Sequence, residues 1–141
     1  MTTAREDELL ARLRGAGVRV TRARHAVIEA LVAGEHDHVT ADALAARVAA
    51  AAPDVHLSTV YRTLDALEQL GLVTHVHLGH GRAVYHLTDR LHHHAVCETC
   101  GWVVELPEDV LADVQQRLRH ETGFEIDPHH FALVGRCAGC R

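Results

Sequence analysis

Four segments in the first half of the chain carry apolar side chains every three or four positions. This spacing predicts helices that each bury one face. The expected helices cover residues 5–14, residues 21–33, a segment from Thr40 that contains Leu44 and Val48, and residues 58–70. Thr21, Thr40 and Ser58 stand where a side-chain hydroxyl can cap the first turn, and Gly71 is placed to end the fourth helix.

After the fourth helix the pattern changes to two β-rich runs. Residues 72–78 and 82–87 flank the turn Gly79-His80-Gly81, which predicts a β-hairpin. Helices followed by a hairpin are the layout of a winged helix-turn-helix, whose recognition helix enters the DNA major groove. The expected recognition helix, residues 58–70, would present four side chains to DNA: Ser58, Thr59, Tyr61 and Arg62.

The second half of the chain predicts a smaller α/β unit. Strands are expected at residues 103–106 and 131–134, with a helix between them at 108–122. The apolar side chains expected to point inward from this helix are Val110, Leu111, Val114 and Leu118. The predicted fold class is therefore α/β (α+β): a winged helix-turn-helix DNA-binding domain at 1–88 and an α/β domain at 89–141, expected to bind metal and to dimerise, with a hinge near residues 88–91.

Composition narrows the class of protein. Each half of a 141-residue chain can bury only a modest core, so dimerisation would add stability. We expect a cytoplasmic protein with no membrane partner, because the chain begins with charged sequence and has no apolar run of membrane-spanning length.

The net charge of −5 disfavours binding to nucleic acid, yet residues 9–28 hold five arginines and no acidic residue. We expect Arg19, Thr21 and Arg24 to face DNA, with a merely solvated basic face as the alternative.

Two Cys-x-x-Cys motifs indicate a structural metal site. They are formed by Cys97 with Cys100 and by Cys137 with Cys140. A pair of thiolates at this spacing can bind one tetrahedral ion, so four cysteines predict structural zinc. Disulfides or a redox pair are the alternatives, although a reducing cytosol disfavours disulfides.

Fourteen histidines are the strongest anomaly in the composition. His75 and His77 lie two residues apart on a predicted strand, and so do His92 and His94, so each pair projects from one strand face and could chelate an ion. His86 on the hairpin and His38 before the third helix could complete such a site. A solvated or core histidine is the alternative for any one of them.

Several of these motifs together resemble the ferric uptake regulator family of metalloregulators. The resemblance covers nearly the whole chain. It rests on three motifs: Ser58-Thr59-Val60-Tyr61-Arg62-Thr63-Leu64, the run His92-His93-His94 that leads into Cys97-x-x-Cys100, and the final Cys137-x-x-Cys140. Within the family, residues 74–81 and His129-His130-Phe131 are similar to the nickel-responsive branch.

The resemblance implies two sets of histidine ligands. One is a regulatory site at the hinge, formed by His38, His86, His92 and His94. The other is a nickel-selective site, formed by His75, His77 and His130. Iron-type members commonly carry glutamate at the position of His86, so the all-imidazole set favours borderline metals such as nickel or zinc. The chain departs from the family at Thr21-Arg22-Ala23-Arg24, where Thr-Pro-Gln-Arg is usual, and at Asp89-Arg90-Leu91, which lacks a histidine.

The expected function is that of a nickel-dependent transcriptional repressor, with Ni²⁺ as the regulatory and Zn²⁺ as the structural ion. It would bind a double-stranded inverted-repeat operator as a homodimer and would use no small organic substrate. The alternatives are a zinc-, iron- or peroxide-responsive regulator of the same family, a metal-storage protein, or a metallohydrolase. We do not expect an enzyme, because no carboxylate or histidine base is placed beside an open metal position.

Overall fold

The computed structural model describes residues 3–34, 38–78, 82–88, 92–127 and 130–141. Internal contacts divide the chain into two compact units: Met1–Thr74 with Val84–Asp89, and His75–Ala83 with Arg90–Arg141. The predicted turn at residues 79–81 and most of the predicted hinge, residues 89–91, lie outside the described residues. The division into domains at 1–88 and 89–141 stays a prediction.

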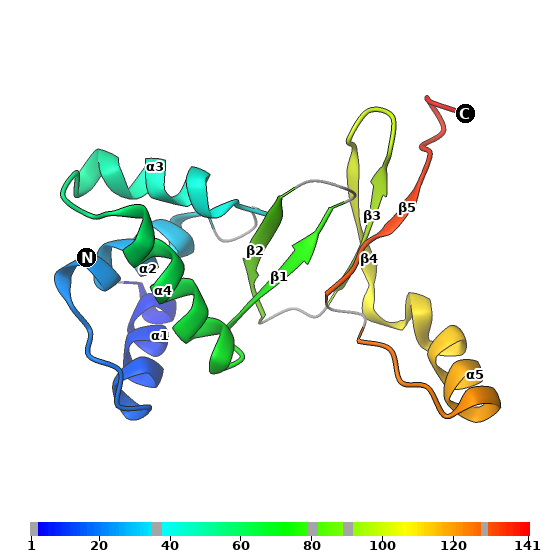
Figure 1. The fold of residues 1–141 in the computed structure, drawn as a ribbon, viewed down its shortest axis with the longest axis horizontal. Coiled ribbons are helices and arrows are strands. Elements are labelled where there is room, and N and C mark those ends of the chain that lie inside the picture. The colour runs from blue at the N-terminus through cyan, green and yellow to red at the C-terminus, as the bar shows by residue number, and fades with distance from the viewer. Residues whose placement is uncertain (1–2, 35–37, 79–81, 89–91, 128–129) are drawn as a thin grey trace. The chain divides into compact units, whose positions relative to one another are not determined.

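Four helices of the N-terminal unit enclose its apolar core (Figure 1). Their bounds are α1 Ala4–Gly15, α2 Arg22–Ala33, α3 Ala41–Ala51 and α4 Leu57–Gln69. The core side chains come from the helical apolar positions, and the largest that are fully buried are Leu13, Ile28, Leu44, Leu64 and Leu67. The predicted caps are confirmed at Thr21 and Thr40, whose Oγ1 atoms accept from the backbone N–H groups of Arg24 and Ala43.

The predicted start of α4 at Ser58 is wrong. The N-cap is His56, which has extended backbone and makes no side-chain cap bond, so Ser58 is the second residue of the helix. The predicted end is confirmed, because Gly71 takes a positive φ of 68°. The N–H of Leu72 then donates to the carbonyl of Leu67 at 2.9 Å, which closes the last turn and directs the chain into the first strand.

The predicted hairpin consists of β1 Val73–His77 and β2 Ala83–Leu87, which pair in a two-stranded sheet. The segment before α3 joins β2 through an antiparallel bridge between Val39 and Tyr85. Val39 N–H donates to the Tyr85 carbonyl at 3.1 Å, and Tyr85 N–H donates to the Val39 carbonyl at 2.8 Å. These two hydrogen bonds hold the backbone of the residues next to Val39 and next to Tyr85 in place.

The C-terminal unit is built on a three-stranded sheet with the order β4-β3-β5. Its strands are β3 His92–Cys97, β4 Val103–Pro107 and β5 Leu133–Gly135. The helical segments η1 Glu108–Leu111 and α5 Ala112–Thr122 lie between β4 and β5 in the chain. β3 is antiparallel to β4 and parallel to β5. Phe131, expected at the start of the last strand, instead forms an isolated bridge with His77.

The predicted inward face of the C-terminal helix is wrong for the single chain. Only Leu111, at the end of the 3₁₀ segment, is buried, whereas Val110 is 46% and Val114 49% exposed and Leu118 is half-buried. α5 itself has no buried residue. The physical reason is that the described residues of one chain provide no layer against which this apolar face packs. The stop at Gly123 is confirmed by its left-handed backbone, with φ 70°.

Candidate metal centres and nucleic-acid interface

The four cysteines converge on one point of the C-terminal unit. β3 and β5 run parallel with Cys97 opposite Gly135, and this register returns the second Cys-x-x-Cys motif to the first. One Sγ atom from each cysteine lies within 4.8 Å of all the others, and the Sγ atoms of Cys100 and Cys137 are 3.8 Å apart. Thiolates bound to zinc at about 2.3 Å with tetrahedral angles are about 3.8 Å apart. The residues therefore fit a structural zinc ion.

The surroundings of Cys97 and Cys140 shift the pKa values of their thiols in opposite directions. Backbone N–H groups of Cys100 and Cys137 lower the pKa of Cys97 to about 6. Hydrogen bonding to Cys137 and, to a smaller extent, to Cys100 raises the pKa of Cys140 to about 12. One member of the cluster thus ionises readily while another keeps its proton, because hydrogen bonding to neighbouring sulfurs favours the protonated form of Cys140. A divalent cation removes that conflict by replacing the protons.

His38 and His86 form the first histidine pair, within the N-terminal unit. They flank the Val39–Tyr85 bridge on the same side, so their rings face each other with centroids 5.2 Å apart. One ligand atom of each lies within 4.8 Å of the other. His86 Nδ1 lies 3.2 Å from the Leu87 carbonyl, so a proton on Nδ1 would be held there and Nε2 would be the metal-binding nitrogen.

His92 and His94 form the second pair, on β3. Alternation along the strand puts both rings on one face, with centroids 4.6 Å apart. His93 points to the other face, where its Nε2 lies 2.8 Å from the Glu108 carbonyl oxygen and its ring is 2% exposed. The His92-His93-His94 run therefore divides into two candidate ligands and one structural histidine.

Glu105 was missed by the sequence reasoning. It lies on β4 opposite His94 in the strand register, and its Oε1 atom is 3.8 Å from His92 Nε2. A carboxylate beside an imidazole pair can act as a ligand or orient one. No spacing along the sequence indicates it, because only the antiparallel pairing of β3 with β4 brings Glu105 to this face.

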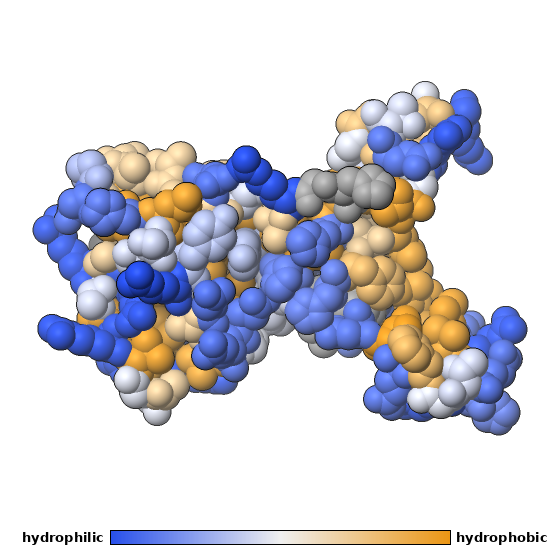
Figure 2. Space-filling model, viewed as in Figure 1, coloured by the Kyte–Doolittle hydropathy of each residue, from blue (hydrophilic) through white to orange (hydrophobic). Residues whose placement is uncertain are grey.

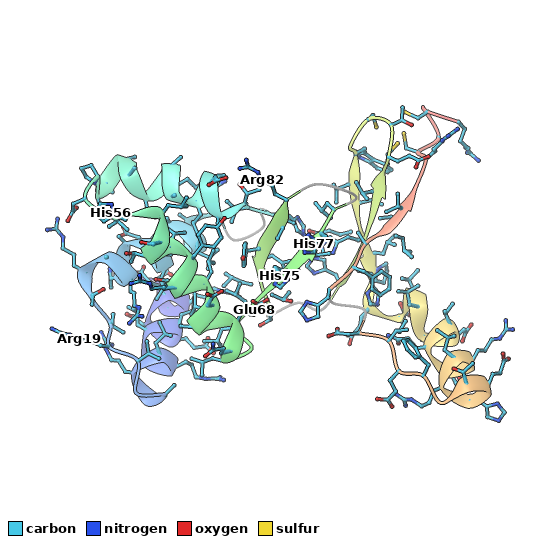
Figure 3. All side chains as sticks on the ribbon, viewed as in Figure 1. Arg19, His56, Glu68, His75, His77 and Arg82 are labelled. Atoms are coloured by element: carbon cyan, nitrogen blue, oxygen red, sulfur yellow. The ribbon has the colours of Figure 1, made fainter. Side chains whose placement is uncertain are left out.

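The third set of predicted ligands is only partly gathered. The bridge between His77 and Phe131 brings the preceding residue, His130, towards β1, and the rings of His75 and His130 have centroids 5.3 Å apart. His77 lies beside His75, with centroids 5.7 Å apart (Figure 3). Among the described residues, no group of ligand atoms within 4.8 Å includes His77. His130 also contacts Asp127, at 3.2 Å.

The predicted DNA-facing residues of α4 are accessible at its N-terminal end. Ser58, Tyr61 and Arg62 are exposed, Tyr61 by 43%, and Thr59 is half-buried. The opposite face of the helix is anchored by core residues, and Thr63 adds a hydroxyl bond to the Thr59 carbonyl at 2.8 Å. A helix held in this way presents its first turn as a rigid surface.

The basic segment before α2 contributes charge beside a helix start. Arg19 is exposed, as Figure 3 shows, whereas Arg24 is half-buried and its Nη1 donates to the Arg19 carbonyl at 2.7 Å. Thr21 uses its hydroxyl as the cap of α2. Of the three, the side chain of Arg19 is the most available to a phosphate, and Arg24 holds the backbone that carries it.

Burial also acts on Tyr85, next to His86. Burial raises the pKa of its phenol, and the carboxylates of Glu68 and Asp65 on α4 raise it further. The shift adds to the ordinary preference of a phenol for its neutral form at physiological pH. This keeps charge off the β2 position that supports the His38–His86 pair.

A winged-helix unit joined to a cysteine- and histidine-rich α/β unit defines a metal-binding DNA regulator. The model of the Ferric uptake regulator family matches residues 15–134, and the chain belongs to that family. Members of this family are metal-dependent transcription regulators and not enzymes. They act as dimers on DNA operators, with an N-terminal DNA-binding domain and a C-terminal dimerisation domain.

Individual relatives match over almost the full chain. The ferric uptake regulation protein of Bacillus subtilis is 34% identical over 140 residues, covering 96% of this chain and 94% of its own. The peroxide-responsive repressor PerR of Staphylococcus epidermidis is 30% identical over 135 residues, covering 96% and 89%. The structure is similar to the ferric uptake regulator of Pseudomonas aeruginosa with manganese, with a TM-score of 0.72, 32% identity, and coverage of 96% and 99%.

The Vibrio cholerae ferric uptake regulator is a further structural neighbour. Its TM-score is 0.69 at 32% identity, with 89% of this chain and 96% of that chain covered. A zinc-bound manganese uptake regulator matches with a TM-score of 0.64 at 27% identity, covering 92% and 98%. Solved relatives thus hold different metals on one fold. No described helix has the length and apolarity needed to span a membrane.

Proposed function

We propose that this chain is a nickel-responsive transcriptional repressor that binds an inverted-repeat operator as a metal-loaded homodimer. The observation that carries the proposal is the presence of two imidazole pairs, His38 with His86 and His92 with His94. Each pair offers nitrogen ligands, which suit nickel and zinc better than metals that prefer oxygen. Together the four residues would hold the regulatory ion.

The two pairs belong to different units, and this supports a regulatory role. His38 and His86 are carried by the DNA-binding unit, and His92 and His94 by the C-terminal unit. When both pairs are ligands of one ion, binding favours the conformer in which the units are held together. That conformer would set the spacing of two α4 helices in major grooves about 34 Å apart, so metal acts as co-repressor.

Nickel selectivity is assigned to His75, His77 and His130. His75 and His130 already have ligand atoms within 4.8 Å of each other, and the i, i+2 spacing on β1 keeps His77 on the same side as His75. A change in the His77 side-chain rotamer would complete an all-imidazole set. The neighbouring His129 lies outside the described residues. Zinc remains the proposed structural ion at the four cysteines.

The apolar surface of the C-terminal unit supports dimerisation through this half. Figure 2 shows hydrophobic residues gathered over β5 and near α5. The exposed large apolar residues of this unit are Trp102, Val110, Val114, Phe124, Phe131, Leu133 and Val134. β5 is an edge strand with every residue exposed, so its outer backbone groups can pair with a second copy. This surface is the proposed dimer interface.

DNA binding at defined free-metal levels tests the proposal. The probe is the chain's own promoter DNA, and the protein keeps its structural zinc while other metal is chelated. Added nickel is expected to raise DNA affinity on the order of 10- to 100-fold, the usual size of such coupling. His38→Ala and His94→Ala should remove that gain. His120→Ala, an exposed histidine on α5, is the matched control and should retain it.

Other outcomes would identify the alternatives. A response to zinc alone at matched free-ion levels would make the chain a zinc-responsive member of the family. A response to ferrous iron alone would make it iron-responsive. Loss of DNA binding with oxidised histidine after iron and peroxide would make it a peroxide sensor. Equal DNA affinity of the chelated dimer and of the dimers loaded with nickel, zinc or ferrous iron would refute the metal switch altogether.

A further inference from the structure

A further group of ligand-type side chains lies between two helices of the N-terminal unit. Glu6 comes from the first turn of α1, and His25 and Glu29 come from α2. His25 and Glu29 are i and i+4, so they lie on one face of their helix. One ligand atom from each of the three residues lies within 4.8 Å of the other two. None of the three belongs to the sites described above.

The two carboxylate oxygens of Glu6 have different surroundings. Oε2 accepts from the Thr3 N–H at 3.4 Å and completes the capping box of α1. Oε1 is buried, accepts no hydrogen bond within the described part of the chain, and lies 3.2 Å from His25 Nε2. Glu6 as a whole is 3% exposed. Burial of a carboxylate oxygen is costly unless a charge or hydrogen bond compensates it.

The distance between Glu6 Oε1 and His25 Nε2 fits two atoms that bind the same metal ion. Ligands held at 2.0 to 2.1 Å with tetrahedral angles are about 3.3 Å apart, close to the 3.2 Å between Glu6 Oε1 and His25 Nε2. Two carboxylates beside one imidazole carry a net negative charge when the imidazole is neutral. A divalent cation neutralises that charge and satisfies Oε1. Glu29 is exposed, so an ion can enter from solvent.

We propose that Glu6, His25 and Glu29 bind a zinc-type divalent ion that joins α1 to α2. Three protein ligands leave one position for water, as they do in other three-ligand zinc sites. The segment with Arg19 and Thr21 directly precedes α2. An ion that holds α2 against α1 would therefore stabilise the part of the unit that is expected to face DNA. This site is independent of the histidine pairs proposed to control the dimer.

Zinc counting on the full chain tests this site. Equilibrium dialysis with Zn²⁺ is compared for the wild type, His25→Ala and Glu29→Gln, with Glu8→Gln as the control because Glu8 is an exposed acid of α1 outside the cluster. We expect His25→Ala to bind one zinc fewer per chain. Glu29→Gln should weaken binding of the same ion by at least about 10-fold, since loss of even an outer-shell partner of a metal ligand costs that much affinity. Glu8→Gln should match the wild type.

A second measurement guards against misfolding. Circular dichroism confirms which variants fold, and Glu29→Gln, at an exposed position, serves if His25→Ala does not. NMR of the wild-type histidine side chains should show a zinc-dependent shift at His25. Unchanged zinc number and affinity in a folded variant, or an unshifted His25, would overturn the proposal. Nickel-dependent DNA binding measured on the same His25→Ala sample reports on the regulatory site separately.

Discussion

His93 Nε2 lies 2.8 Å from the carbonyl oxygen of Glu108, and this contact separates the central histidine of the run from its two neighbours. His93 is almost fully buried, on the face of β3 opposite to His92 and His94. Three identical residues in sequence therefore have two different roles. The central one links the sheet to the 3₁₀ segment, and the outer two are available as ligands.

Replacing His93 by alanine should lower the free energy of unfolding by about 1 to 3 kcal/mol, because the packing of the buried imidazole and its contact with the Glu108 carbonyl are both lost. Nickel-dependent DNA binding should persist in the folded fraction. His94→Ala should behave in the opposite way, losing the metal response. Thermal denaturation and DNA titration on the two variants measure this contrast. A His93→Ala protein that was stable but unresponsive to metal would contradict it.

Acidification should release the structural zinc. The pKa of Cys97 is lowered from 9.0 to about 6, so its thiolate contribution is present above the ordinary value and is lost as pH falls through about 6. A colorimetric zinc chelator should detect release centred in that range or below, since bound zinc itself opposes protonation. Cys137→Ser should release zinc at higher pH. Zinc retention by Cys137→Ser equal to that of the wild type would argue against a four-thiolate site.

Two arginines should differ in their effects on DNA recognition. Arg62→Ala, on the exposed first turns of α4, should reduce affinity for the operator by about 1 to 3 kcal/mol if the side chain reaches a base. Arg19→Ala should weaken binding to all sequences and lower the salt slope by about 1, as expected for a phosphate contact. Arg117→Ala, on α5, is the control. Equal losses on operator and random DNA for Arg62→Ala would reassign it to the backbone.

The edge strand should control the oligomeric state. Val134 on β5 is 54% exposed, and Val134→Asp would place a charge in the proposed interface. Analytical ultracentrifugation should show a dimer Kd raised by at least about 10-fold, since one buried, unpaired charge costs several kcal/mol. Leu57→Asp makes the same type of change at an exposed apolar residue of the N-terminal unit. A dimer weakened equally by both variants would place the interface elsewhere.

Much of the N-terminal fold could be predicted because its signals are local. Apolar spacing gave the helices, and the hydroxyls of Thr21 and Thr40 marked two of their starts correctly. The start of α4 was misplaced because Ser58 is a good cap by type, whereas the backbone turns at His56. A favourable side chain does not decide a helix start when the backbone already enters the helix earlier.

The candidate sites depend on pairings that no local pattern contains. Glu105 reaches the His92 face only through the β3–β4 register, and His130 approaches His75 only through the bridge at His77 and Phe131. The apolar residues of α5 were assigned to a core that one chain does not possess. Hydrophobic periodicity identifies a face to be covered, but it does not tell whether the cover comes from the same chain.

The bridge between Val39 and Tyr85 would make the proposed metal response depend on a short piece of backbone. Two hydrogen bonds hold the segment before α3 on β2, and His38 is next to one end of them. If His38 and His86 bind metal as proposed, their apparent affinity for the ion is scaled by the fraction of molecules in which those bonds are formed. In the proposed repressor, substitutions that loosen this segment, such as at the Thr40 cap, would raise the metal concentration needed for DNA binding without altering any histidine.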